Sequence, residues 1–178
     1  LQDATRGTEL WDKCMEAGAE LGIEPAAPST IRSVEGAILS YCSDITRHDN
    51  PWTVGLGRLV DVDKPGEYIG KTALQKIARE GPARRLVGVE IAGDPLPGND
   101  AFWDVLHAGQ TVGHLTRCTW SPRLKKNLGF VNVSAGVAGE GSELAIAIPG
   151  GQRRAVVVPI PWVQSETRIP DPPNSPNE

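Results

Sequence analysis

The chain has 178 residues, of which 39% are hydrophobic and 22% are charged, enough for one domain or for a small domain and part of a second. Its net charge of −4, with Lys and Arg scattered along the sequence, gives no footprint for nucleic acid. No run approaches the ~20 apolar residues of a membrane helix, and the first residues lack a signal or transit pattern. We therefore expect a cytoplasmic protein that binds neither nucleic acid nor a membrane.

The number and spacing of the cysteines argue against disulfides and against a metal site. Cys14, Cys42 and Cys118 are an odd number without C-x-x-C spacing, which argues against a disulfide framework and against a zinc site. We expect reduced thiols in or near the core and no bound metal. The chain starts at Leu1 and its first element follows almost at once, so we also expect a fragment of a longer protein.

Two helices are predicted near the start. Residues 8–21 place apolar side chains on one side at three-to-four spacing and acidic or basic ones on the other, the pattern of an amphipathic helix. Gly22 ends this helix as a C′ residue. A second helix should open at Ser29 or Thr30, either of which can cap it, and should run to near Ser40.

The next elements are shorter. We predict a strand over 55–62 and a helix from Lys71 to Arg79, followed by a break at Gly81-Pro82 of the kind that marks a domain boundary. From residue 84 onward, short apolar runs alternate with Gly- and Pro-rich turns. The predicted strands cover 85–92, 103–106, 111–118, 128–132, 143–148 and 154–160.

This order of elements predicts an α+β fold, in which a helical and mixed segment is followed by a small closed or sandwiched antiparallel unit of about six strands. The predicted divisions are residues 1–82, residues 83–166 for the strands, and a flexible Pro-rich tail over 167–178, which has too little apolar material to pack.

The residues alone name no catalytic group. His48, His107 and His114 are isolated from one another in the sequence, so surface or structural roles are expected for them. Trp120 stands between Arg117 and Lys125-Lys126, and an aromatic face flanked by cations can receive a planar anion. The alternative is a Pro-terminated turn whose Trp covers a barrel end, and the sequence leaves both open.

Several spaced motifs resemble one family. The stretch from Arg32 to Tyr41, with Ser43-Asp44 and Asp49-Asn50-Pro51, resembles the R-x-E-x-G-x-x-x-Y-G-x-D…N-P segment of glycine-cleavage T-protein-like folate transferases. Further pieces follow in the family's order: Gly55 to Asp61, Tyr68 to Leu74, Arg85 to Val89, Val112 to Thr116, Trp120-Ser121-Pro122, Lys125 to Gly129, Ala155 to Val157 and Pro161 to Val163. Arg117 stands where the family usually has a second hydroxyl residue. The resemblance runs from about residue 9 to 165.

Within that family the sequence is most similar to dimethylsulfoniopropionate demethylase-like members. It shares with them the Gly-Thr-Glu-Leu-Trp-Asp insertion beginning at Gly7 and the run from Leu39 to Pro51. Glycine-cleavage enzymes usually carry A-R-D before the second helix, with the arginine binding folate, whereas here the aligned residues are Ala27, Pro28 and Ser29.

The resemblance implies a fold of three lobes around a folate channel, and it implies that residues 83–166 form the last lobe as a small antiparallel β-barrel of about six strands. It implies transfer of a one-carbon group to N5 of tetrahydrofolate, from a sulfonium or related small-molecule methyl donor. The catalytic residues are unknown, because the family's pterin-contacting carboxylates would lie upstream of Leu1, in an N-terminal half supplied by the same gene or by a separate chain.

Four residues are candidates for binding tetrahydrofolate. Arg32 could pair with the glutamate tail, or could be a solvated helix residue. Trp120 and Trp162 at barrel-strand ends could line the channel, or could be core aromatics. Arg168, or its neighbour Thr167, stands near the position of a ligand-contacting tyrosine in glycine-cleavage enzymes.

Two other readings stay open. The chain could be the folate-binding half of a flavin-linked dimethylglycine or sarcosine oxidising enzyme, which has similar lobes. It could also be a non-catalytic binding module built on the barrel, since Pro28 stands where a folate contact is usual.

Overall fold

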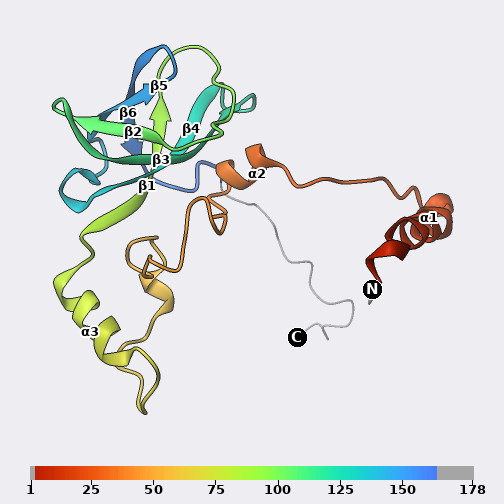
Figure 1. The fold of residues 1–178 in the computed structure, drawn as a ribbon, viewed down its shortest axis with the longest axis horizontal. Helices are drawn as coiled ribbons and strands as arrows, with labels where there is room; N and C mark the ends of the chain where they lie inside the picture. Colours follow the sequence, from red (N-terminus) through yellow and green to blue (C-terminus); the bar gives the residue numbers. More distant parts are fainter. Residues whose placement is uncertain (1–2, 164–178) are drawn as a thin grey trace, which may run out of the picture.

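The structure is a computed structural model that describes residues 3–163, and it has two regions (Figure 1). Residues 3–82, the lobe segment, hold the three α-helices joined by irregular stretches, and residues 84–158 hold the strands of a barrel. The helix α1 (Gly7–Gly18) lies at the end of an extended stretch, far from the barrel. The helix α2 (Thr30–Glu35) lies against the barrel, and α3 (Lys71–Glu80) lies on the other side of the lobe segment.

The barrel confirms the predicted fold class. Its six strands are β1 (Arg84–Ile91), β2 (Trp103–His107), β3 (Gln110–Ser121), β4 (Lys126–Ser134), β5 (Glu143–Ile148) and β6 (Gly151–Val158). They close in the order β1-β4-β3-β2-β5-β6, and every neighbouring pair is antiparallel. Closure leaves no unpaired sheet edge, so the strands satisfy one another's backbone groups.

The strands match the predicted runs with shifted ends. Most are longer than predicted because polar residues at the strand ends continue the ladders, as Gln110 does in β3 by pairing with His107. The turn between β2 and β3 is tight, since Ala108 and Gly109 both have positive φ values of 49° and 79°, which suits a two-residue hairpin. The last strand ends at Val158 and not at the predicted Ile160.

Aliphatic side chains fill the inside of the barrel. Among them, Leu115, Ile146 and Val105 are fully buried. Since each strand contributes alternate residues to this core, the period-2 pattern in the sequence reports the inner face.

Strand β4 differs because both of its faces are covered. Its seven interior residues are all buried. Val131 and Val133 point into the barrel core, whereas Leu128 and Phe130 belong to a second cluster that includes Val34 of the lobe segment. The outer wall of the barrel is therefore part of the interface with the lobe segment.

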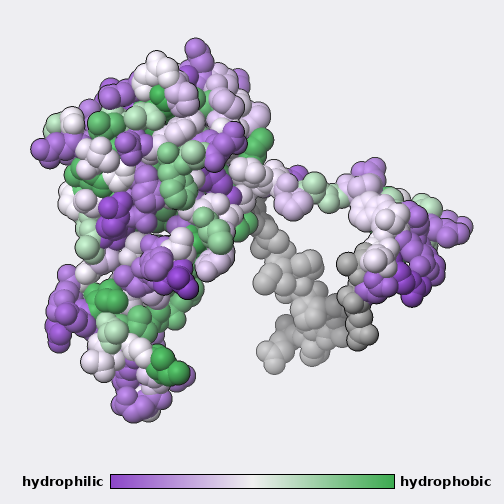
Figure 2. Space-filling view, in the orientation of Figure 1, coloured by the Kyte–Doolittle hydropathy of each residue, from purple (hydrophilic) through white to green (hydrophobic). Residues whose placement is uncertain are grey.

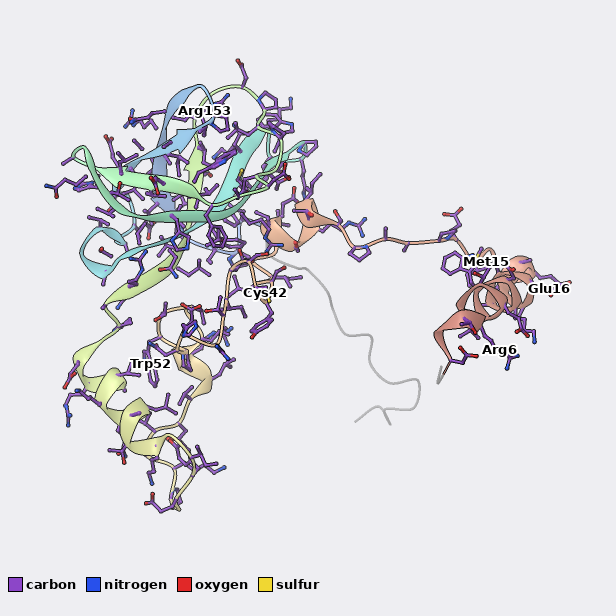
Figure 3. All side chains as sticks on the ribbon, viewed as in Figure 1. Arg6, Met15, Glu16, Cys42, Trp52 and Arg153 are labelled. Atoms are coloured by element: carbon purple, nitrogen blue, oxygen red, sulfur yellow. The ribbon has the colours of Figure 1, made fainter. Side chains whose placement is uncertain are left out.

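The first helix is confirmed and is exposed on every side. Helix α1 is followed by a 3-10 turn over Ala19–Leu21 and ends at Gly22, whose φ of 69° is left-handed. No residue of α1 is buried, and Leu10 and Trp11 are about half exposed at 48% and 53%. Figure 3 shows the α1 side chains Met15 and Glu16 far from Cys42. The predicted apolar stripe exists, but no described residue covers it.

The second helix is shorter than predicted. Ser29 caps α2, with its Oγ accepting from the backbone N–H of Arg32 at 3.3 Å. The helix stops at Glu35 and not near Ser40, because Gly36 is its C-cap and Ala37 has a φ of 53°. A left-handed residue turns the chain out of the helix.

The predicted strand over 55–62 is wrong. The chain there makes local backbone bonds, such as Leu56 N–H to Pro51 O at 2.7 Å, and forms a 3-10 helix over Gly57–Leu59. Gly57 allows this tight curl, since a Cβ on it would lie 2.7 Å from the Trp52 ring. Gly57 therefore belongs to a turn and not to a strand.

The third helix confirms the predicted Lys71–Arg79 span with one more residue, Glu80. Gly70 and Gly81, with φ values of 87° and 78°, bound it at its two ends. Strand β1 begins three residues after Gly81, so the Gly81-Pro82 break separates helix from barrel. The predicted tail over 167–178 lies outside the described residues.

Candidate functional site

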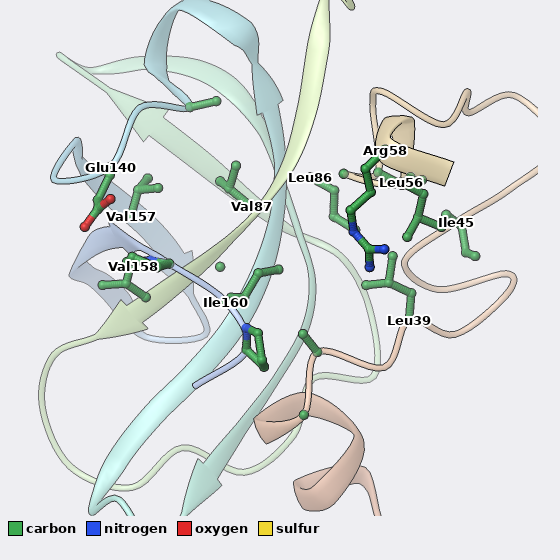
Figure 4. A pocket seen from close by; sticks show the side chains of 18 residues that line it. Leu39, Ile45, Leu56, Arg58, Leu86, Val87, Glu140, Val157, Val158 and Ile160 are labelled. Atoms are coloured by element: carbon green, nitrogen blue, oxygen red, sulfur yellow. The ribbon is translucent and has the colours of Figure 1, made fainter. Parts of the chain in front are cut away.

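A cavity of about 720 Å³ opens between the lobe segment and the barrel (Figure 4). The loop after α2 forms one wall, and the strands β1 and β6 with the chain after β6 form the other. Its lining residues are Gly36, Ala37, Leu39, Ile45, Val54, Gly55, Leu56, Arg58, Leu86, Val87, Gly88, Ala138, Glu140, Val157, Val158, Pro159, Ile160 and Pro161. This volume falls in the range of small-molecule sites.

The walls are mainly aliphatic, with one acidic and one basic side chain. Figure 4 shows Arg58 beside Leu56 and Leu39 on the lobe side, and Glu140 beside Val157 on the barrel side. A cavity with apolar walls and charges at separate places can hold a flat, largely apolar body and orient its polar ends. The cavity is therefore suited to holding a ligand in a fixed orientation.

A packed floor lies next to this cavity. The Trp162 ring packs on Phe130 with ring centroids 5.4 Å apart. Gly88 permits the close approach of the chain after β6, because a Cβ there would lie 2.2 Å from Ile160 Cγ2 and 2.8 Å from the Trp162 ring. A side chain at residue 88 would push this wall away from the barrel.

A buried polar network joins the loop after α2 to β3. The Arg117 guanidinium donates from Nη2 to Asp44 Oδ2 at 2.6 Å and from Nη1 to Ser33 Oγ at 2.9 Å. Thr116 Oγ1 donates to Asp44 Oδ1 at 2.8 Å. The Asp44 side chain is fully buried and that of Arg117 is 14% exposed, so the pair is shielded from solvent. Such charges are retained in folded proteins when they are paired and hydrogen-bonded.

A second polar contact joins α2 to the end of β3. The fully buried Ser121 donates from Oγ to Glu35 Oε1 at 2.5 Å, and its Oγ also accepts from the backbone N–H of Leu124 at 3.1 Å. The backbone N–H of Val163 donates to Glu35 O at 3.0 Å. Glu35 thus joins β3 and the chain after β6 to the same helix.

The candidate residues from the sequence lie in different places. Arg32 is exposed on α2. Trp162 lies beside the cavity, against Phe130 and Gly88, whereas Trp120 lines a separate groove of about 480 Å³ together with Lys125. Arg168 lies outside the described residues. Of the three candidates within residues 3–163, only Trp162 lies next to the cavity wall.

Sequence reasoning missed the residues that shape the cavity. Asp44 and Arg58 stood inside the family motifs without a role, and Glu140 carried no signal, because their positions depend on how two distant segments meet. Arg117 was considered only as a cation beside Trp120, whereas the structure pairs it with Asp44. One signal was available: an arginine at a position where the family usually has a hydroxyl residue predicts a new partner for its charge.

The described residues offer no cluster of metal-ligating side chains. No group of three His, Cys, Asp or Glu side chains within 3–163 is placed to hold a metal ion. Burial and the nearby Arg84 lower the pKa of His114, which stacks on Phe102 with ring centroids 4.8 Å apart. Burial raises the pKa of the Cys118 thiol to about 11, and its thiolate is therefore scarce at neutral pH.

Among the helices of this part of the chain, none has the length and hydropathy needed to cross a bilayer.

Comparison with known proteins places the barrel in a family. Residues 84–164 match the model of the glycine cleavage T-protein C-terminal barrel domain. An aminomethyltransferase of Synechococcus sp. strain CC9902 is 36% identical over 163 residues, which cover 91% of this chain and 43% of that protein. The dimethylsulfoniopropionate demethylase of Ruegeria pomeroyi is 37% identical over 153 residues, covering 85% of this chain and 41% of that protein.

A solved structure has the same fold. The glycine cleavage system aminomethyltransferase T from Bartonella henselae superposes with a TM-score of 0.66 over 73% of this chain and 36% of that one, at 21% identity. The chain spans less than half the length of these relatives.

The fold defines a protein with a small closed antiparallel barrel, against which a helical lobe segment packs so that a cavity remains between them. The chain belongs to the glycine-cleavage T-protein family, and residues 84–164 are its C-terminal barrel domain. This confirms the resemblance seen in the sequence motifs.

Proposed function

We propose that this chain forms the barrel side of the tetrahydrofolate site in a one-carbon transferase that moves a methyl or aminomethyl group. The observation that carries this proposal is the cavity of about 720 Å³ between the lobe segment and the barrel. The relatives matched over 85% to 91% of this chain are an aminomethyltransferase and a demethylase, and they supply the reaction class.

The cavity suits part of a folate molecule. Its aliphatic walls fit the flat ring systems, and the Arg58 guanidinium can pair with a carboxylate. Arg32 and Arg168 are further candidates for the carboxylates of the glutamate tail, and Trp162 and Trp120 for ring contacts. We propose that the remaining hydrogen-bonding groups for the pterin come from sequence that accounts for the rest of the relatives' length.

Uncovered apolar surface supports a site shared with more protein. Figure 2 shows apolar residues gathered below the barrel and around α3. Tyr41 and Leu59 are 67% and 66% exposed, and both line a further apolar groove of about 360 Å³ on the lobe segment. Soluble proteins seldom leave such patches without a partner. The partner we propose is the N-terminal half of the same enzyme.

The mechanism we propose is positioning. Bound tetrahydrofolate would supply N5 as the acceptor of the one-carbon group. A sulfonium methyl is already activated by its positive charge, so the protein's task is to hold donor and acceptor in line and to exclude water. The apolar walls of the cavity serve that task.

The proposed function has two versions, which differ in the donor of the one-carbon group. The sequence features shared with demethylase-like proteins favour a sulfonium donor, and the similarity to aminomethyltransferases supports an aminomethyl donor. The two differ in product, since a sulfonium donor gives 5-methyltetrahydrofolate and an aminomethyl donor gives the methylene form.

The test uses the full-length parent protein. Tetrahydrofolate titrated by calorimetry should give saturable heat, and 5-methyltetrahydrofolate should compete with it. Incubation with dimethylsulfoniopropionate or with an aminomethyl donor, followed by chromatography of the folates, identifies the donor.

A matched pair of variants tests the candidate arginine. Arg32→Ala should weaken binding of tetrahydrofolate about 10-fold, the value of one charged hydrogen bond. Arg79→Ala, on the exposed face of α3, should not change it.

If tetrahydrofolate gives no heat with the parent protein and 5-methyltetrahydrofolate does not compete, the chain is a non-catalytic binding module.

A further inference from the structure

The loop from Gly36 to Ile45 is held in a conformation that its own sequence disfavours. Ala37 has a φ of 53° and Cys42 a φ of 72°, values that residues with a Cβ rarely adopt. Figure 3 shows Cys42 on the part of this loop that faces away from the barrel. Strained backbone persists only where surrounding contacts over-determine it.

The contacts that hold the loop converge on Arg117 and Asp44. Arg117 Nη2 donates to the carbonyl of Ile38 at 2.8 Å, next to the strained Ala37. Asp44 Oδ2 accepts from the backbone N–H of Ser40 at 2.8 Å, which closes the turn that contains Cys42. Each strained residue therefore stands beside a contact made by the same ion pair.

A bulge in β3 lets two consecutive residues take part. The register of β3 with β4 shifts between Leu115 and Arg117, so Thr116 is the extra residue. Thr116 and Arg117 both reach Asp44, although neighbouring residues of a regular strand point to opposite faces. Bulges re-aim side chains in this way beside functional sites.

The guanidinium is needed because it makes several contacts at once. It bonds Ser33, Ile38 and Asp44 and lies over the Phe130 ring at 5.6 Å from the centroid. A hydroxyl side chain, usual at this position in the resembling family, has one oxygen and can replace at most part of this set.

The loop held in this way forms a wall of the cavity. Gly36, Ala37, Leu39 and Ile45 all line it, and each lies within or beside the segment that Arg117 and Asp44 hold. We propose that Arg117 and Asp44 are positioning residues that fix this wall, and that they set the affinity for the folate ligand without touching it. The inference about the ligand rests on the proposed function, whereas the inference about the loop does not.

The first experiment uses this chain alone. Hydrogen exchange measured by mass spectrometry should show the amides of 36–45 exchanging at least 10-fold faster in Arg117→Ser, with the exchange of β5 and β6 unchanged. The matched control is Arg154→Ser, which removes an arginine from an exposed surface pair with Glu143 and should leave 36–45 unchanged. Equal exchange in Arg117→Ser and the parent chain would overturn the proposal.

Two milder variants guard against unfolding. Asp44→Asn keeps the shape of the side chain, and Arg117→Lys keeps a charge but loses the planar fork. Both should speed exchange in 36–45 by less than Arg117→Ser does. If they leave it unchanged while Arg117→Ser unfolds the whole chain, the pair has a role in global stability only, and the proposal is wrong.

The second experiment uses the full-length parent enzyme. Arg117→Ser should raise KM for tetrahydrofolate about 10-fold and change kcat less than about 2-fold, because a positioning residue for the wall acts on binding. Arg117→Lys should recover part of the loss. An unchanged KM in Arg117→Ser overturns the inference, whereas absence of tetrahydrofolate binding by the parent enzyme overturns the proposed function and leaves the exchange result to decide the role of the loop contacts.

Discussion

The barrel and the lobe segment obtain their order in different ways. The barrel strands pair with one another in a closed ring and enclose a core of their own, in which Leu115 and Ile146 are fully buried. In the lobe segment, helices α1 and α3 have no buried residue. Its buried Val34 and Val54 cluster with Leu86, Leu128 and Phe130 from the outer wall of the barrel. The lobe segment thus buries its apolar side chains where the barrel supplies a surface. The cavity lies where the two regions do not pack against each other.

The largest expected effect compares one leucine in each region. Leu115→Ala should lower the free energy of unfolding by about 2–5 kcal/mol, because it leaves a void in the closed core. Leu10→Ala on α1, where the residue is 48% exposed, should change it by less than about 0.5 kcal/mol. Urea unfolding followed by circular dichroism measures both. Equal losses would show that α1 packs in solution as the barrel core does.

The reactivity of the three thiols also distinguishes the lobe segment from the barrel. Cys14 and Cys42 in the lobe segment are exposed, whereas Cys118 in β3 is buried. A thiol-reactive disulfide reagent at pH 8 should label the first two rapidly and Cys118 only when the barrel opens. Rapid labelling of all three thiols in the folded chain would contradict a closed barrel.

The pH dependence follows from the same burial. Burial raises the pKa of Cys118 from its usual 9.0 to about 11. Between these values the unfolded chain loses a proton that the folded barrel keeps, so the free energy of unfolding falls as pH rises. The contribution of Cys118 to the free energy of unfolding is fully present below pH 9.0 and decreases by up to about 1.4 kcal/mol per pH unit between pH 9.0 and about 11. Cys118→Ala should show a shallower decline over the same window, and an identical decline would place the thiol at the surface.

The smallest effect tests how far the two regions unfold independently. Ser29→Ala removes the cap of α2 and should cost about 1 kcal/mol of local protection in that helix. Hydrogen exchange in β5 and β6 should not change. An equal loss in those strands would mean that lobe segment and barrel form one cooperative unit.

The barrel was predictable from sequence because its order is local and periodic. The runs at 143–148 and 85–92 alternate between an inner and an outer face, and Gly- and Pro-rich turns separate them, so each strand could be located from its own residues. The helices α1 and α3 were equally visible from their spacing. In each case the pattern lies within one element.

The lobe segment was less predictable where glycines and turns decide the path. The prediction of a strand over 55–62 failed because Gly57 packs its backbone under Trp52, a contact that apolar periodicity does not reveal. The length of α2 was overestimated because Ala37 turns left-handed, and alanine carries no turn signal. Arg117 holds the carbonyl beside Ala37 from 79 residues away in the chain.

The sequence by itself determined the family, the helices α1 and α3 and the approximate positions of the six strands, because motifs and periodicity lie within short stretches of the chain. Only the tertiary structure decided which face of β4 meets the lobe segment, that Asp44 and Arg117 pair in a buried network, and that a cavity lies beside them. Those features depend on contacts between segments far apart in the chain, and burial gives such contacts their strength: a charge removed from water must find a partner wherever the fold places one.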